Sequence, residues 1–126
     1  MNELAAKISA SEVEVLEVLW RSEGPMPIAA IRNALEETHS WDASTVKTLL
    51  RRLREKGAVD CEKRDVFYYW PLLSRKEYQR WSTQSFVQRV YQGSARDLVA
   101  GLVECCPSPE DLSELRGILY PDERRG

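Results

Sequence analysis

The feature that most constrains the fold is the order in which the hydrophobic repeat changes along the chain. Apolar residues recur every three to four positions in three successive segments of the first half, and from Val59 onward the repeat changes to alternation. A repeat near 3.6 predicts helices, whereas a repeat of two predicts strands. The sequence therefore predicts three helices followed by a two-stranded hairpin.

The first two predicted helices have recognisable ends. Ser9 and Glu12 have the spacing of a capping box at the start of the first helix, and Gly24-Pro25 ends it. The second helix is expected to open near Pro27 and to end around Thr38-His39. Each of these helices has one apolar face, so both are expected to pack on a shared core.

The third helix has the strongest pattern of the chain. Asp42 is placed to cap its N-terminus, and Gly57 supplies the stop. Its apolar residues follow the i, i+3, i+4, i+7 pattern and are expected to face the core: Val46, Leu49, Leu50 and Leu53. The hairpin that follows is predicted to turn at Lys63-Arg64-Asp65 and to end at Pro71.

Three short helices are predicted to complete the chain. Each begins with a serine that is followed three positions later by an acidic residue: Ser74 with Glu77, Ser94 with Asp97, and Ser108 with Asp111. A segment this short cannot bury three apolar stripes, so pairing with a second copy is expected to cover them; the alternative is that they fold back on the N-terminal part. The expected dimerisation residues are Tyr78, Trp81, Phe86, Val90, Leu98, Val99, Leu102, Val103, Leu112, Leu115 and Leu119.

Together these elements predict a fold that is mainly α with a small β-hairpin. Three helices followed by a hairpin is the order of a winged helix-turn-helix, in which the hairpin is the wing. The expected domains are a winged helix-turn-helix over residues 1–73 and a helical dimerisation region over residues 74–126.

Positive charge is concentrated in one part of an otherwise acidic chain. The formal net charge is −2, but between Ser44 and Arg64 there are seven basic and three acidic residues, which is a local net charge of +4. The outward face of the third helix carries hydroxyls, methyl groups and cations, which suit base edges in the major groove. We expect Ser44, Thr45, Lys47, Thr48 and Arg51 to contact base edges of double-stranded DNA, and Arg52, Lys63 and Arg64 to contact mainly phosphates.

Other interpretations of the same residues stay open. The polar helix face could be merely solvated, and the winged fold could serve a protein-interaction adaptor that does not bind DNA. A third interpretation keeps DNA binding and makes Cys105 and Cys106 a switch for a metal or an oxidant. No metal site is expected, because zinc prefers four ligands and no second cysteine pair exists.

Neither catalysis nor membrane insertion is expected. His39 is the one histidine, and the chain has no HExxH pattern and no glycine-rich phosphate loop, so we expect neither an enzyme nor a cofactor. No apolar run approaches the roughly 20 residues that span a bilayer, and no secretory signal is found. A cytoplasmic location with reduced cysteines is the expectation.

Residues spread over nearly the whole chain share one pattern. They are Ile8-Ser9 with Glu12 and Glu14 ahead of Trp20, Trp41 followed by Ser44 to Leu49, Arg52-Leu53 with Lys56-Gly57, Val90-Tyr91 with Gly93, Leu98-Val99, and Glu114-Leu115 with Ile118-Leu119. In these positions the sequence resembles the penicillinase repressor family, which includes β-lactamase and methicillin-resistance repressors. The resemblance implies a homodimeric winged-helix repressor whose third helix reads an inverted repeat, as in the operator of a β-lactamase operon.

The resemblance also implies a further partner. In that family a membrane sensor protease ends repression by way of cleavage within the dimerisation region, at a bond between Asn and Phe. The aligned pair here is Gly101-Leu102, so the candidate cleavage site departs from the family pattern. A copper-responsive branch carries a C-terminal cluster of paired cysteines, of which this chain has only Cys105-Cys106, and that branch is therefore disfavoured.

Overall fold

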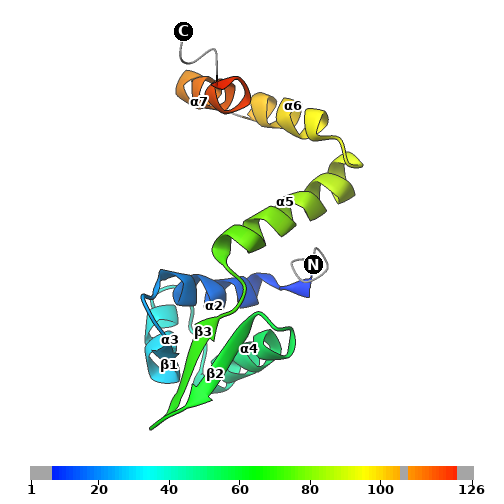
Figure 1. The fold of residues 1–126 in the computed structure, drawn as a ribbon. Coiled ribbons are helices and arrows are strands. Elements are labelled where there is room, and N and C mark those ends of the chain that lie inside the picture. Colours follow the sequence, from blue (N-terminus) through cyan, green and yellow to red (C-terminus); the bar gives the residue numbers. More distant parts are fainter. Residues whose placement is uncertain (1–6, 106–107, 122–126) are drawn as a thin grey trace. The chain divides into compact units, whose positions relative to one another are not determined.

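The computed structural model describes residues 7–105 and 108–121 and confirms a mainly helical fold with a small antiparallel sheet (Figure 1). These residues divide into two compact units, and the division between Ser85 and Phe86 falls within helix α5 (Arg75–Tyr91). The boundary predicted after residue 73 precedes this division. Within the described residues, no helix is long and apolar enough to cross a membrane.

The first unit is built from helices packed beside a three-stranded sheet. Its elements before α5 are α2 (Ala10–Arg21), β1 (Met26–Pro27), α3 (Ile28–Glu36), α4 (Ala43–Glu55), β2 (Val59–Lys63) and β3 (Phe67–Pro71). The predicted hairpin is confirmed, since β2 pairs with β3 in antiparallel register, with Cys61 opposite Tyr69. The strand order is β1-β3-β2.

Strand β1 was not predicted from the sequence. It pairs with β3 through Met26 opposite Tyr69 and Pro27 opposite Tyr68. Two residues are too few to show a repeat, and both prolines in Pro25-Met26-Pro27 favour a turn or a helix start instead. Proline is nevertheless compatible with an edge strand, where one N–H is not needed for pairing.

The core of this unit lies where the helices meet the sheet. All four inward-facing residues predicted on the third helix are confirmed as buried, with Val46, Leu50 and Leu53 fully so. The remaining core residues are Ile8, Val15, Leu16, Val18, Leu19, Ile31, Leu35, Ala58, Val59 and Leu73. Because α4 gives one face to this core, its opposite face remains exposed to solvent.

Local hydrogen bonds confirm the predicted start of the first helix and the predicted stop of the third, whereas α2 ends at Arg21 and α3 at Glu36, two to three residues before their predicted ends. The Ser9 hydroxyl accepts from the Glu12 N–H at 3.2 Å, and the Glu12 carboxylate accepts from the Ser9 N–H at 2.8 Å, which completes the capping box. At the end of α4, Gly57 adopts a φ of +80°, and its N–H donates to the Arg54 carbonyl at 3.0 Å. This left-handed residue closes the helix and turns the chain into β2.

The second unit contains the end of α5, together with α6 (Ala95–Cys105) and α7 (Pro109–Leu119). All three predicted serine caps are present in α5, α6 and α7, and in each the serine hydroxyl accepts from the acidic residue's N–H at 3.0 to 3.1 Å. Helix α5 is longer than the short helix expected, with 17 residues, and ends before Gly93 at a φ of +84°.

An ion pair joins the start of α2 to the end of α4. The Lys56 ammonium donates to the Glu12 carboxylate at 2.6 Å and to the Lys7 carbonyl at 2.6 Å. Glu12 is only 1% exposed. Burial opposes ionisation of this carboxyl, but the hydrogen bonds from Lys56 and Ser9 outweigh it and hold the pKa of Glu12 below its ordinary value of 4.5.

This pair predicts acid sensitivity of the fold. A carboxyl whose pKa is lowered by folding stabilises the protein above its unfolded pKa, and that contribution disappears as the pH falls through the folded pKa, hence below about 4.5. We expect Glu12→Gln to lower the free energy of unfolding at pH 7 by about 1–3 kcal/mol and to flatten its decline in acid. Urea unfolding between pH 7 and 3 measures this, with the exposed Glu36→Gln as control. Parallel pH profiles for wild type and Glu12→Gln would contradict the assignment.

Candidate nucleic-acid interface

The outward face of α4 carries the predicted base-contacting residues. Ser44, Lys47 and Arg51 are exposed, whereas Thr45 and Thr48 are half-buried along the same helix. Arg52 is also exposed, on the next position around the helix. The structure therefore presents a continuous strip of hydroxyls and cations on the side opposite the buried Val46 and Leu50.

The start of this strip is held in place by a helix cap. The Asp42 carboxylate accepts from the Thr45 backbone N–H at 2.8 Å. This hydrogen bond lowers the pKa of Asp42 below its usual range, so the cap is ionised at neutral pH. The Thr48 hydroxyl donates to the Ser44 carbonyl at 3.0 Å. With that proton engaged inside the helix, Thr48 offers its methyl group to a partner, which suits the methyl of thymine.

Arg51 is only loosely restrained. Its guanidinium lies 3.7 Å from the Glu55 carboxylate, and both side chains are about two-thirds exposed, at 66% and 64%. An exposed pair of this kind contributes little stability, at most about 1 kcal/mol. The guanidinium can therefore leave Glu55 for a base or a phosphate at small cost.

The predicted wing residues lie at the hairpin tip, far along the sheet from its attachment to the helices (Figure 1). Lys63 is the last residue of β2 and is exposed. Arg64 lies in the turn, 3.6 Å from Glu62 and with its guanidinium 4.9 Å above the Tyr68 ring. The ring supports the arginine from one side and leaves its donors exposed, as a phosphate contact requires.

The predicted dimerisation residues are divided between the two units. Tyr78 and Trp81 are half-buried and pack against the core of the first unit. In the second unit Leu98, Val99 and Leu115 are half-buried. The others are exposed: Phe86, Val90, Leu102, Val103, Leu112 and Leu119. Ile118 and Tyr120, which were not in the predicted set, are exposed as well.

The candidate cleavage pair lies inside a regular helix. Gly101 and Leu102 are both within α6, and Gly101 packs against the side chain of Tyr91. A Cβ atom at position 101 would lie 2.6 Å from the Tyr91 hydroxyl, closer than such contacts allow. The glycine therefore has a packing role in this unit.

The cysteines are free where the structure describes them. Cys61 is half-buried in β2 and Cys105 is exposed at the end of α6, while Cys106 lies outside the described residues. In residues 7–105 and 108–121, no three His, Cys, Asp or Glu side chains come together as a metal site would need.

The sequence profile of a family described as "Penicillinase repressor" matches residues 8–120. The methicillin resistance regulatory protein MecI of Staphylococcus aureus is 31% identical over 124 residues, covering 94% of this chain and 98% of that protein. The penicillinase repressor of Bacillus licheniformis is 32% identical over 121 residues, covering 94% of each.

Two solved structures are also similar. The DNA-binding domain of the repressor BlaI superposes with a TM-score of 0.52 at 33% identity, covering 57% of this chain and 88% of that one. The Bacillus licheniformis BlaI monomer in complex with the blaP half-operator gives a TM-score of 0.50 with the same identity and coverage.

Proposed function

This chain belongs to the penicillinase repressor family, and from that premise we propose that it represses transcription by binding operator DNA through helix α4. The observation that carries the proposal is the exposed strip of hydroxyls and cations on α4, opposite a fully buried face. The similar BlaI monomer was solved in complex with a half-operator, which favours a DNA-binding function over that of a protein-interaction adaptor. A location in the cytoplasm, where its DNA would be, follows from this proposal.

Within the interface, residues near the start of α4 read sequence. A recognition helix meets base edges mainly with its N-terminal turns. Ser44, Thr45, Lys47 and Thr48 occupy those turns, and Arg51 lies one turn further along. Lys47 and Arg51 can donate to purine acceptors in the major groove, while the threonines supply methyl groups.

The remaining cations position the protein on the duplex. Arg52 on α4 and Lys63 and Arg64 at the wing tip are exposed, as contacts to phosphate oxygens require. Phosphate contacts fix register and orientation but carry no sequence information. We therefore propose that these three residues contribute to the affinity for any DNA and that the strip on α4 determines which DNA sequence is preferred.

The second unit serves as the dimerisation region in this proposal. Among its described residues, Gly117 is the only one that is buried, so the unit has no apolar core of its own. A second copy that covers the exposed apolar residues of α5, α6 and α7 would supply an apolar core. Two copies of the first unit, which ends at Ser85 and which we call the head, fit a pseudo-palindromic operator when a two-fold axis relates them. Sedimentation equilibrium of the full chain at micromolar concentration is the direct measurement, with a dimer mass expected.

The targets we propose are genes of a β-lactam resistance operon. Two similar proteins are named for methicillin resistance and for penicillinase. Release from DNA by a membrane sensor protease would need cleavage of the Gly101-Leu102 bond, which lies within α6. The helix must unfold locally before a protease can reach that bond. Measuring whether the chain stays intact while the genes that it regulates are induced tests this route.

Binding to DNA selected from a random duplex pool tests the function, and Lys63→Ala tests the assignment of the wing. Losing one phosphate contact in each copy of the dimer should weaken binding to every duplex alike and reduce the slope of log affinity against log salt by roughly two units. Thr48→Ala on α4 is the matched comparison, because it should change the preference among operator variants and leave the salt slope as it is. If both variants bind as the wild type does, or if no duplex is preferred at low salt, the proposal fails.

A further inference from the structure

The start of α5 is fastened to α2 by contacts that converge on Trp20. The indole N–H donates to the Leu73 carbonyl at 2.8 Å, and the Tyr78 ring lies with its centre 5.8 Å from that of the Trp20 indole. Arg75 pairs with Glu17 at 2.9 Å while its guanidinium lies 5.7 Å above the Trp20 ring. We call these five residues the joint.

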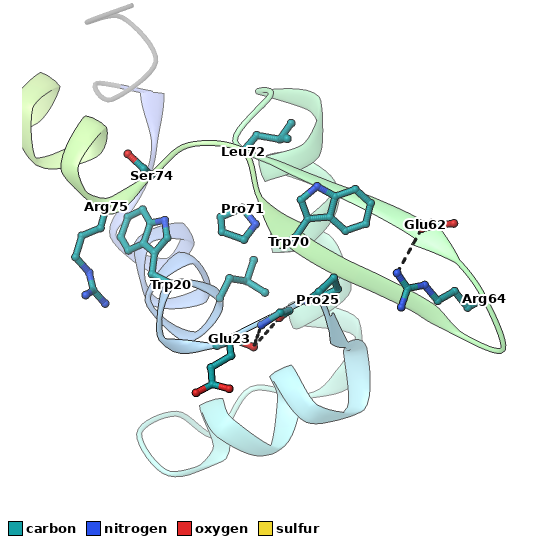
Figure 2. Close-up of a pocket in the computed structure, with 13 residues that line it drawn as sticks. Trp20, Glu23, Pro25, Glu62, Arg64, Trp70, Pro71, Leu72, Ser74 and Arg75 are labelled. Atoms are coloured by element: carbon teal, nitrogen blue, oxygen red, sulfur yellow. Dashed lines mark hydrogen bonds and ion pairs between the residues drawn. The ribbon is translucent and has the colours of Figure 1, made fainter.

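Figure 2 shows the Trp20 ring beside Arg75 and beneath the segment that carries Ser74, at one end of a pocket of about 690 Å³. The joint is only partly enclosed, because the Arg75 and Glu17 side chains are 44% and 40% exposed. Leu73, in contrast, is 3% exposed and belongs to the core. The joint therefore ties a solvent-facing helix start to the buried part of the head.

Because α5 is continuous, a small change in its direction at the joint produces a large displacement at its far end. The helix runs unbroken from Arg75 to Tyr91, and at 1.5 Å per residue it is about 25 Å long. The proposed dimerisation residues begin on this same helix, with Phe86. A change of about 20° in the direction of α5 at the joint would displace its far end by about 9 Å, which is more than two base-pair steps.

We propose that the joint is a specificity-determining device: by fixing the direction in which α5 leaves the head, it sets the half-site spacing that the dimer accepts. This inference rests on the proposed function, since spacing has meaning only for two heads on one operator. Trp20, Arg75 and Tyr78 act in it as positioning residues, because they act through α5 and not by touching DNA. A loosened joint should broaden the range of accepted spacings without altering how one head reads one half-site.

The test measures the affinity of the full chain for operators whose half-sites are moved together or apart by one or two base pairs, and for a duplex with a single half-site. Wild type is expected to prefer one spacing by about tenfold or more over a two-base-pair change. Arg75→Glu, which places two carboxylates side by side, should reduce that preference to about threefold or less, with half-site affinity unchanged within about twofold.

A charge swap and two controls make the result decisive. Glu17→Arg combined with Arg75→Glu restores an ion pair with reversed polarity and should restore the wild-type spacing preference. Trp20→Phe, which removes the indole donor to Leu73, should broaden the preference as Arg75→Glu does. Arg80→Glu on the same helix and Trp70→Phe in the same pocket lie outside the joint and should leave the profile unchanged.

Two outcomes would overturn the inference. One is an unchanged spacing profile in both Arg75→Glu and Trp20→Phe. The other is an equal loss of affinity for the single half-site and for every spacing, which would show that the joint only supports the fold of the head. Absence of any duplex preference in the wild-type chain would instead refute the proposed function, so the two failures are distinguishable.

Discussion

Lys47→Ala is expected to weaken binding of the proposed dimer to its operator by about a hundredfold or more. Lys47 is exposed in the second turn of α4, on the strip that carries Ser44 and Arg51. A side chain that donates to base edges contributes about 1–3 kcal/mol of discrimination, and a symmetric dimer loses the contact twice. A loss of about 2.7 kcal/mol corresponds to a hundredfold change in the dissociation constant. Fluorescence anisotropy with labelled operator at fixed salt measures it.

The control for this prediction removes the same charge elsewhere. Lys76→Ala takes an exposed lysine from α5, outside the proposed interface, and should change operator affinity by less than about threefold. The affinity of Lys47→Ala for random duplex should fall far less than its affinity for the operator, because base contacts carry the specificity. Equal losses on operator and random duplex would move Lys47 from the base-reading set to the phosphate set.

Much of the head could be predicted because its signals are local. The capping box of Ser9 and Glu12, the Asp42 cap and the Gly57 stop each depend on residues within a few positions of one another. The apolar repeat of α4 assigned its buried and exposed faces for the same reason. Because the candidate interface lies on one helix and one hairpin tip, these local signals were sufficient to place its residues on the outward surface.

Contacts between segments that are distant in the sequence could not be predicted from such local signals. The Lys56–Glu12 pair joins residues 44 positions apart, and the Trp20–Leu73 hydrogen bond joins residues 53 positions apart. Tyr78 and Trp81 have helical spacing, and that spacing cannot reveal whether they pack on their own head or on a partner. Strand β1 pairs with the edge of β3 that β2 leaves free, and no repeat in the sequence marks it. The features that could not be predicted are therefore mainly tertiary contacts between distant segments.

The two faces of α4 predict opposite effects from neighbouring substitutions. Leu50 is fully buried in the core, so Leu50→Ala should remove apolar burial and leave a cavity, at a cost of about 2–5 kcal/mol in the free energy of unfolding. Since its side chain points away from the exposed strip, affinity for the operator should stay within about threefold at a temperature where the variant is folded. Lys47→Ala should show the converse, with stability within about 0.5 kcal/mol of wild type. Urea unfolding at fixed protein concentration and anisotropy on the same samples separate the two. A Leu50→Ala variant that loses under about 1 kcal/mol would contradict the packing of α4 on which the whole interface depends.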